Sequence, residues 1–252
     1  MISIVRNKYG IPINDIFFSD NPRAVDGESP ITFFVQARRP QDGFDQFKTS
    51  VINLRGDSGI IFNSLSSNTR YKIKRAEREG YTPSIAQRVT ASDIDNFCDF
   101  FNLFAAHKRL PIANAAKLHA LCAKNSLIFS AITDSKGDTV AMHAYIADSN
   151  LERVRLLYSA SHFRERSNSE ERNAIGRANR LLHWYEIESL GKAGYASYDL
   201  GGIPMKNDDP EKNAIARFKS EFGGEHVIEF NGIVCHSRLL QSGLSFARRI
   251  WA

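Results

Sequence analysis

The sequence predicts an α+β fold in which helices flank a mixed, largely antiparallel sheet. The first observation is a succession of three apolar runs, at residues 127–133, 139–147 and 153–160, separated by short polar turns. Runs of this length and spacing are typical of strands that pair with their neighbours in sequence. The second observation is that apolar residues recur at helical spacing over residues 65–79 and 173–190, on either side of the three runs.

The N-terminal part of the chain, residues 2–60, is expected to be rich in strands. Strands are predicted at residues 31–36 and 50–54, where β-branched and aromatic side chains concentrate. Turn residues separate them, at Asn21-Pro22, Asp26-Gly27 and residues 57–59.

Residues 65–123 are predicted to form three helices, with one strand between the first and the second. The helix over residues 65–79 leads into a strand at residues 81–87. Thr90 or Ser92 can cap the next helix, and a shorter helix is expected at residues 114–123. The capped helix carries an apolar face made of Ile94, Phe97, Phe100, Phe101 and Phe104.

The long helix at residues 173–190 is followed by a strand, a short helix and a last strand. The strand at residues 195–200 ends at Gly201-Gly202, which places Asp199 at its C-terminal end. The helix spans residues 211–222, where Gly223-Gly224 stops it. The last strand is predicted at residues 227–230.

The C-terminal segment has the pattern of a basic amphipathic helix. It would pack on its own domain or, as the alternative, lie on a membrane surface. The residues that make this pattern are Arg238, Leu239, Leu240, Leu244, Phe246, Arg248, Arg249, Ile250 and Trp251.

Length and composition favour an ordinary globular protein of 252 residues. A single domain over residues 1–252 is expected, with a core at 63–252 and a β-rich part at 1–62 that could be a degenerate second lobe. No apolar run is long enough to span a bilayer, and no signal peptide is recognisable, so a cytoplasmic protein is expected.

Cysteine spacing and net charge limit the classes of ligand that are expected. Cys98, Cys122 and Cys235 lie far apart, without metal-ligand spacing, so no metal is expected. The net charge of +5 suits an anionic ligand such as a nucleotide, a nucleotide-sugar, coenzyme A or RNA, and the alternative is that it serves solubility alone. No DNA-binding motif is present, so duplex DNA is not expected as a partner.

Three segments, taken together, resemble the catalytic lobe of FemAB-like acyltransferases, a branch of the GNAT (Gcn5-related N-acetyltransferase) superfamily. They are NTRYKIKRAEREGY at 68–81, RNAIGRANRLLHWYEIESLGKAGY at 172–195 and YASYDLGGIPMKNDDPEKNAIARFKSEFGGE at 195–225. The resemblance implies a GNAT-like lobe and transfer of an acyl group to an amine. It also implies an activated donor, either a coenzyme A thioester or an aminoacyl-tRNA.

The same resemblance implies a donor site at the start of the long helix. In the superfamily, backbone N–H groups at a helix N-terminus hold a pyrophosphate, with the signature Arg/Gln-x-x-Gly-x-Gly/Ala. The matching stretch runs from Asn173 through Gly176 and Arg177 to Ala178, and Asn173 departs from the signature. The alternative is a plain amphipathic helix whose small residues pack on the sheet.

A basic stripe is predicted on the helix at residues 65–79. Arg70, Lys74 and Arg78 lie four residues apart and share one face, and Tyr71 flanks it. Such a stripe could bind the phosphates of a substrate, because guanidinium groups suit phosphate oxygens. The alternative is a solvated face.

Lys219 is the leading catalytic candidate. The resemblance implies that the lysine of the Phe-Lys pair at 218–219 stabilises negative charge on the donor phosphate or the reacting carbonyl. Arg217 could assist substrate binding. The alternative is a surface lysine whose stem covers Phe218 and Phe222.

Several residues could accept the proton that an amine loses during acyl transfer. Asp199 and His143 are the leading candidates, and His183 or Glu186 on the long helix are alternatives. Some acyltransferases rely on positioning and need no dedicated base. No nucleophile elbow or Cys–His spacing is present, so covalent catalysis is not expected.

The sequence therefore predicts an N-acyltransferase. The expected donor is acetyl-CoA or another acyl-CoA, and the expected acceptor is the amine of a nucleotide- or lipid-linked amino sugar in cell-envelope polysaccharide synthesis. Two alternatives remain open: a tRNA-dependent aminoacyl transferase, and an inert lobe that binds a nucleotide, RNA or a protein.

Overall fold

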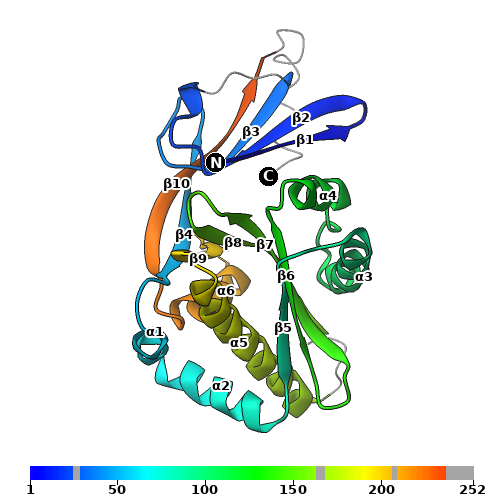
Figure 1. Ribbon diagram of the computed structural model, residues 1–252, viewed down its shortest axis with the longest axis vertical. Helices are drawn as coiled ribbons and strands as arrows, with labels where there is room; N and C mark the ends of the chain where they lie inside the picture. Colours follow the sequence, from blue (N-terminus) through cyan, green and yellow to red (C-terminus); the bar gives the residue numbers. More distant parts are fainter. Residues whose placement is uncertain (25–28, 163–167, 206–208, 237–252) are drawn as a thin grey trace. The chain divides into compact units, whose positions relative to one another are not determined.

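The computed structural model describes residues 1–24, 29–162, 168–205 and 209–236 (Figure 1). Contacts divide them into two compact units, residues 1–48 with 227–236, and residues 49–226. The sequence analysis ended the N-terminal part at residue 62, whereas contacts group residues 49–62 with the larger unit. The proposal that the N-terminal part is a degenerate second lobe stays a prediction.

The smaller unit is built on strands. β1 (Ile2–Lys8) and β2 (Ile11–Phe17) form an antiparallel hairpin, and β3 (Ile31–Ala37) runs parallel to β2. A short 3-10 turn at Pro22–Ala24 lies between β2 and β3 in sequence. β10 (Glu225–Cys235), which starts in the larger unit, pairs antiparallel with β3. The sequence analysis predicted a β-rich segment here without resolving the hairpin.

The larger unit contains a sheet whose strand order is β4-β9-β8-β7-β6-β5. The predicted meander is confirmed, because β6, β7 and β8 pair antiparallel in succession. Among these neighbours only β8 and β9 run parallel. The bounds are β4 (Asp45–Asn53), β5 (Thr82–Ala86), β6 (Leu127–Thr133), β7 (Thr139–Asp148), β8 (Arg153–Ser161) and β9 (Ser197–Gly202).

Helices cover both faces of this sheet. Neighbouring residues of one strand point to opposite faces, and on β6 Phe129 stacks on Phe97 of α3 while Ser130 donates a hydrogen bond to Glu186 of α5. α3 and α5 therefore lie on opposite sides (Figure 1). The helices are α1 (Ser58–Ser64), α2 (Ser67–Arg78), α3 (Ala91–Lys108), α4 (Ala115–Ala123), α5 (Ser169–Lys192) and α6 (Pro210–Ser220).

Side-chain caps explain where the helices begin. Thr90, one of the two predicted caps, forms a reciprocal capping box with Asp93 that starts α3. Asn168 caps α5, so this helix begins at Ser169 and not at the predicted residue 173. The helix predicted over residues 65–79 corresponds to α2, which Ser66 caps, whereas α1 replaces the turn predicted at residues 57–59.

The core of the larger unit lies between the sheet and α5. Its largest fully buried side chains include Tyr145 on β7 and Tyr198 on β9. In the described part of the chain, no helix combines the length and apolar character that a bilayer crossing requires. The amphipathic pattern predicted at residues 238–251 lies outside the described residues.

Gly223, which follows α6, is required by both conformation and space. Its φ is +73°, and an added Cβ would lie 3.0 Å from the carbonyl oxygen of Ser64. Gly194 has a comparable φ of +93° but open space around it. Substitution of Gly194 therefore tests backbone strain alone, whereas substitution of Gly223 tests backbone strain together with a steric contact.

We expect Gly223→Ala to destabilise the protein more than Gly194→Ala does. The left-handed conformation alone costs an alanine roughly 1–2 kcal/mol, and only Gly223→Ala adds a steric contact. Urea unfolding of both variants measures the difference. Equal losses would show that the approach of Ser64 to Gly223 carries no energetic weight.

Candidate active site

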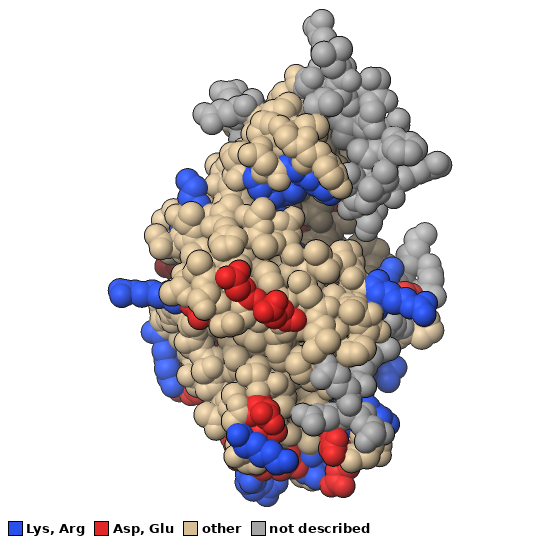
Figure 2. Space-filling model, turned by 90° about the vertical axis from the view of Figure 1, so that its right-hand side faces the viewer, with Lys and Arg blue, Asp and Glu red and all other residues tan. Residues whose placement is uncertain are grey.

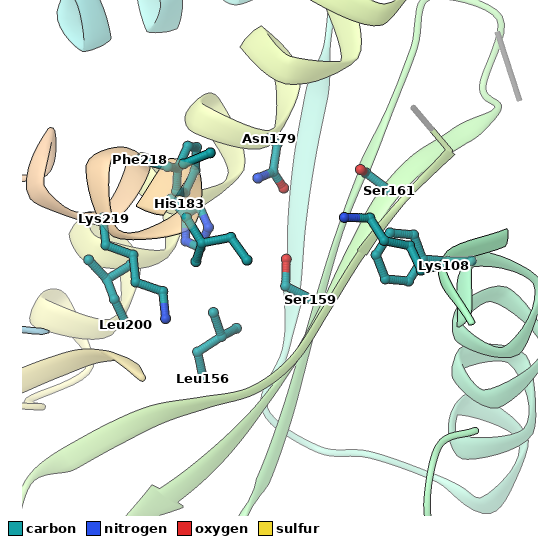
Figure 3. A pocket seen from close by; sticks show the side chains of 12 residues that line it. Lys108, Leu156, Ser159, Ser161, Asn179, His183, Leu200, Phe218 and Lys219 are labelled. Atoms are coloured by element: carbon teal, nitrogen blue, oxygen red, sulfur yellow. The ribbon is translucent and has the colours of Figure 1, made fainter. Parts of the chain in front are cut away.

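A cavity opens where two neighbouring parallel strands part. β8 and β9 pair over only three residues, from Arg153 to Arg155 and from Ser197 to Asp199, although β8 continues to Ser161. The cavity beside them has a volume of about 490 Å³ (Figure 3). The lining residues come from α3, β8, α5, β9 and α6. They are Phe104, Lys108, Leu156, Ser159, Ser161, Asn179, His183, Leu200, Ala214, Ile215, Phe218 and Lys219.

The cavity combines apolar walls with a few polar groups. Leu156, Leu200 and Phe218 supply apolar surface, while the ammonium groups of Lys108 and Lys219 enter from opposite sides (Figure 3). A largely apolar cavity with few, well-placed polar groups is the usual form of a small-molecule site.

Lys219 is half-buried, so the part of α6 that carries it is not a fully solvated face. Its Nζ donates a hydrogen bond to the carbonyl oxygen of Gly202 at 2.7 Å. Burial lowers the pKa of Lys219 to about 8. The negative charge of Asp199 opposes this shift, and the positive charge of Arg155 adds to it. The residue therefore remains largely cationic at neutral pH.

Asp199 does not lie where the sequence analysis placed it. It is the third residue of β9, which continues to Gly202, and its carboxylate is fully buried. The carboxylate accepts hydrogen bonds from Thr49, from Arg153 at 2.6 Å and from the backbone N–H of Gly201 at 2.7 Å. Burial raises the pKa of Asp199, but the larger combined effect of Arg153, Arg155 and Thr49 lowers it. The pKa of Asp199 therefore lies below its usual value. Asp199 is not among the cavity-lining residues.

A buried polar network lies behind one wall of the cavity, centred on Glu186 of α5. Tyr145 and Tyr198 each donate to Glu186 Oε2 at 2.6 Å, and Ser130 donates to Oε1. His143 Nδ1 lies 2.8 Å from Oε1. We call the set Ser130, His143, Tyr145, Asn179, His183, Glu186 and Tyr198 the Glu186 network.

Two members of the Glu186 network reach the cavity. His183 lines the cavity, and its Nδ1 lies 2.7 Å from the hydroxyl of Tyr198. Asn179 also lines the cavity, and its Oδ1 lies 2.9 Å from Nε2 of His143. His143, a predicted catalytic candidate, is fully buried and does not line the cavity. Asn179 lies between its ring and the cavity.

Burial and hydrogen bonding set the charges in this network. Burial raises the pKa of Glu186, but the charge and hydrogen bonds of His143 and His183 outweigh it and lower that pKa far below its usual value. Burial, reinforced by nearby His143, lowers the pKa of His183 to about 4, although Glu186 opposes the shift. Burial and Glu186 raise the pKa of Tyr198 well above its usual value. At neutral pH Glu186 is ionised, and His183 and Tyr198 are neutral.

His143, His183 and Glu186 also have the atom types of a metal site, with ligand-type atoms within 4.8 Å of one another. Two ligands of a tetrahedral zinc ion lie roughly 3.3 Å apart, from bond lengths of about 2.0–2.1 Å. His143 Nδ1 and Glu186 Oε1 lie only 2.8 Å apart, which is a hydrogen-bond distance. Hydrogen bonds account for the cluster.

The predicted donor-phosphate residues lie one turn inside α5. The helix begins at Ser169, so the backbone N–H groups of Asn173, Gly176, Arg177 and Ala178 are inside the helix and not at its N-terminus. Ala178 is buried. The other three residues line a groove between α2 and α5, together with Tyr71.

This groove carries more positive than negative charge, and its volume is about 420 Å³. Arg177 donates twice to Glu79, and Arg180 donates to Glu221 at 2.7 Å. The cations that line the groove are Lys72, Arg75, Arg172, Arg177 and Arg180. Burial and nearby Arg180 lower the pKa of Lys72. Arg180 also lies 4.7 Å over the ring of Phe218, a cavity residue, so groove and cavity adjoin.

The predicted basic stripe on α2 is divided in the structure. Arg70 donates to the carbonyl oxygens of Asn63 and Leu65, at 2.7 and 2.5 Å, and so connects α2 to α1. Lys74 lies 5.7 Å over the ring of Phe62. Arg78, and Arg217 on α6, are exposed and line neither the cavity nor the groove.

Figure 2 shows one face of the molecule, on which Lys and Arg lie scattered among acidic and uncharged residues. The net charge of +5 is not gathered into a single basic field on the part of this face that the structure describes.

The sequence analysis did not identify Asn179, Tyr145 and Tyr198 as site residues, although their spacing carries a signal. Asn179, His183 and Glu186 lie at positions i, i+4 and i+7, which share one helix face. His143 and Tyr145 lie two residues apart on one strand and share one sheet face. Polar residues repeated on buried faces of two elements indicate a polar network between them.

No family model matches the chain, and no curated protein matches its sequence. Solved structures do match it. FemX aligns with a TM-score of 0.64 at 12% identity, over 95% of this chain and 85% of FemX. The C-terminal domain of a lysylphosphatidylglycerol synthetase candidate from Agrobacterium fabrum aligns with a TM-score of 0.55 at 14% identity, over 98% and 84% of the two chains. L-PGS from Bacillus licheniformis aligns with a TM-score of 0.55 at 14% identity, over 86% and 72%.

At identities of 12–14%, these alignments establish the fold and no more. The predicted fold class, a GNAT-like α+β fold, is confirmed. The predicted resemblance to FemAB-like proteins is confirmed at the level of the fold, which this chain shares with FemX, the lysylphosphatidylglycerol synthetase domain and L-PGS.

The lowered pKa of Lys219 predicts how the free energy of unfolding changes with pH, and this can be measured without a substrate. Its pKa falls from 10.5 to about 8 on folding, so between these pH values the unfolded chain binds a proton that the folded chain does not. The wild type therefore gains stability relative to Lys219→Met as the pH rises through that window. Urea unfolding of both proteins at pH 7 and pH 10 measures the change. A difference that stays constant would show that Lys219 is solvated like an ordinary surface lysine.

Proposed function

We propose that the chain is an N-acyltransferase that moves an acyl group from an activated donor to an amine in the cavity beside β8 and β9. The observation that carries the proposal is the position of Lys219, a partly buried ammonium group at a largely apolar cavity. A cation in such a place stabilises negative charge more strongly than it would in water. Acyl transfer generates that charge on the carbonyl oxygen.

Lys219 would act on the carbonyl oxygen of the donor. The hydrogen bond to Gly202 positions the ammonium group, and within the described residues two of its three N–H donors remain for a ligand. Gly201 lies beside this group, where an added Cβ would make an ordinary contact with Nζ at 3.7 Å, and its φ of +78° favours glycine at this turn of the chain. The positioned ammonium group then meets the oxygen as negative charge develops on it.

The cavity and the adjoining groove support a substrate class. A volume of about 490 Å³ suits a small acyl group and its amine acceptor. The groove between α2 and α5 has the positive charge that suits the phosphates of a coenzyme A thioester or a nucleotide-linked acceptor. Acetyl-CoA is therefore the first donor to test, with an amino sugar as acceptor. A place in envelope polysaccharide synthesis stays a prediction.

The second candidate is aminoacyl transfer from tRNA. The excess of cations in the same groove favours it, because RNA phosphates require the same charges. A tRNA donor predicts that binding weakens steeply between 50 and 200 mM salt, whereas a thioester donor predicts a weaker dependence.

We expect Lys219→Gln to lower kcat/KM by roughly 10²–10³-fold, the usual loss when one oxyanion donor is removed. Mass spectrometry of the acylated product measures transfer from acetyl-CoA to glucosamine and UDP-glucosamine, and in a parallel arm from aminoacyl-tRNA. Lys212→Gln, an exposed lysine on the same helix, is the matched control and should retain activity. No transfer by the wild type from either donor class would overturn the proposal and favour an inert binding lobe.

The pH profile should report the same ammonium group. Because the pKa of Lys219 is about 8, kcat/KM should fall as the pH rises through that value and Lys219 loses its proton. Lys219→Arg keeps its charge at every accessible pH, so its residual activity should lack this alkaline limb. An identical limb in Lys219→Arg would assign it to another group.

A further inference from the structure

His183 occupies the one position of the Glu186 network at which an imidazole ring faces the cavity directly. Its ring is almost fully buried, yet the residue lines the cavity. The hydrogen bonds recorded for this ring in the described chain involve Nδ1, which leaves Nε2 without a protein partner there.

The hydrogen bonds of Tyr198 favour one tautomer of His183. The Tyr198 hydroxyl lies 2.6 Å from Glu186 Oε2, 2.6 Å from the Tyr145 hydroxyl and 2.7 Å from His183 Nδ1. Ionised Glu186 can only accept hydrogen bonds and is the strongest acceptor of the three, which favours a Tyr198 hydrogen on Oε2. In that arrangement the Tyr198 oxygen accepts from Nδ1–H of His183. A neutral imidazole with its proton on Nδ1 carries its lone pair on Nε2.

We infer that His183 is the general base of the proposed transfer and that Tyr198 and Glu186 are positioning residues that hold it in the reactive tautomer. The inference rests on the proposed function. Nε2 takes the proton of the attacking amine, and the imidazolium ion that forms faces the Glu186 carboxylate, whose Oε2 lies 3.3 Å from Nδ1.

The proton balance of the step closes within the cavity. The amine nitrogen forms a bond to the carbonyl carbon, and the bond from that carbon to the donor's sulfur or oxygen breaks. The amine proton passes to Nε2 and then to the departing sulfur or oxygen, which returns His183 to its neutral form. Lys219 keeps its protons throughout and stabilises the carbonyl oxygen.

The other candidate bases are engaged elsewhere. Asp199 is held by Arg153, Thr49 and the Gly201 N–H group. His143 uses both ring nitrogens, one toward Glu186 and one toward Asn179. Glu186 is buried and accepts several hydrogen bonds at once. Of the four predicted bases, His183 has both a cavity position and an open lone pair.

The titratable groups around His183 come from every element packed on it. They are Glu186 on α5, His143 and Tyr145 on β7, Tyr198 on β9 and Lys219 on α6. Glu186 favours a proton on His183, whereas His143 and Lys219 oppose it. Between about pH 4 and pH 8, His183 is therefore neutral and able to accept a proton while Lys219 is cationic.

The test compares His183→Asn, Tyr198→Phe and the control His119→Asn, an exposed histidine on α4. Asn at position 183 retains an N–H donor for Tyr198 but cannot accept a proton. With acetyl-CoA and the acceptor found for the wild type, His183→Asn should lose roughly 10²–10⁴-fold in kcat. It should also lose the acid limb near pH 4, and added imidazole should restore part of its rate.

Tyr198→Phe should keep the base but displace the acid limb, because Nδ1 loses its hydrogen bond to the Tyr198 hydroxyl. A merely structural role for Tyr198 would lower the rate without moving that limb. In parallel, ¹⁵N NMR of the histidine rings in the wild type should show Nδ1 protonated and Nε2 unprotonated for His183 at pH 7.

The outcomes separate this inference from the proposed function. Transfer by the wild type that His183→Asn retains, with the same pH profile, overturns the inference alone. A protonated Nε2 at pH 7 overturns it as well. Absence of transfer by the wild type overturns the proposed function and the inference with it.

Discussion

The short parallel pairing of β8 and β9 is the constraint on which the site depends. The strands are joined over three residues and then diverge, and the cavity occupies the space that the missing pairs leave. A fully paired sheet would fill this space with backbone hydrogen bonds and exclude a ligand. Helices α3 and α5 on opposite faces of the sheet, with α6, close the sides of the opening. One interruption in a regular sheet therefore creates both a place for a reaction and rigid elements to hold its side chains.

Two charges of opposite sign have separate roles, one on partly buried Lys219 and one on fully buried Glu186. Lys219 brings positive charge to the cavity, where the pKa near 8 shows the cost of burying an ammonium group. Glu186 brings negative charge behind the wall, where four side chains hydrogen-bond to it. A buried carboxylate is costly unless its oxygens are hydrogen-bonded, and the two tyrosines, Ser130 and His143 meet that requirement. In the proposed reaction, the positive charge of Lys219 would stabilise the carbonyl oxygen. The negative charge of Glu186 would stabilise His183 after it accepts a proton.

The sequence predicted those features that depend on neighbours in the chain. The bounds of β6, the capping of α3 by Thr90 and the meander follow from local spacing. Asp199 was misplaced because its partners are remote: Arg153 lies 46 residues away and Thr49 lies 150 residues away. β9 runs through its glycines because Gly202 pairs with Thr49 on β4. The Glu186 network joins three strands and a helix, so only a face-by-face comparison of distant elements could have indicated it. The role of Lys219 and the donor remain predictions.

The central claim is that an activated carbonyl group lies between Lys219 and His183 in the cavity beside β8 and β9. A crystal structure of the protein with acetyl-CoA and the acceptor amine tests it most directly. The account predicts density for the thioester in this cavity, with its carbonyl oxygen within hydrogen-bond distance of Lys219 Nζ and the amine facing His183 Nε2. A donor bound elsewhere on the protein, with the cavity filled by water, would contradict it.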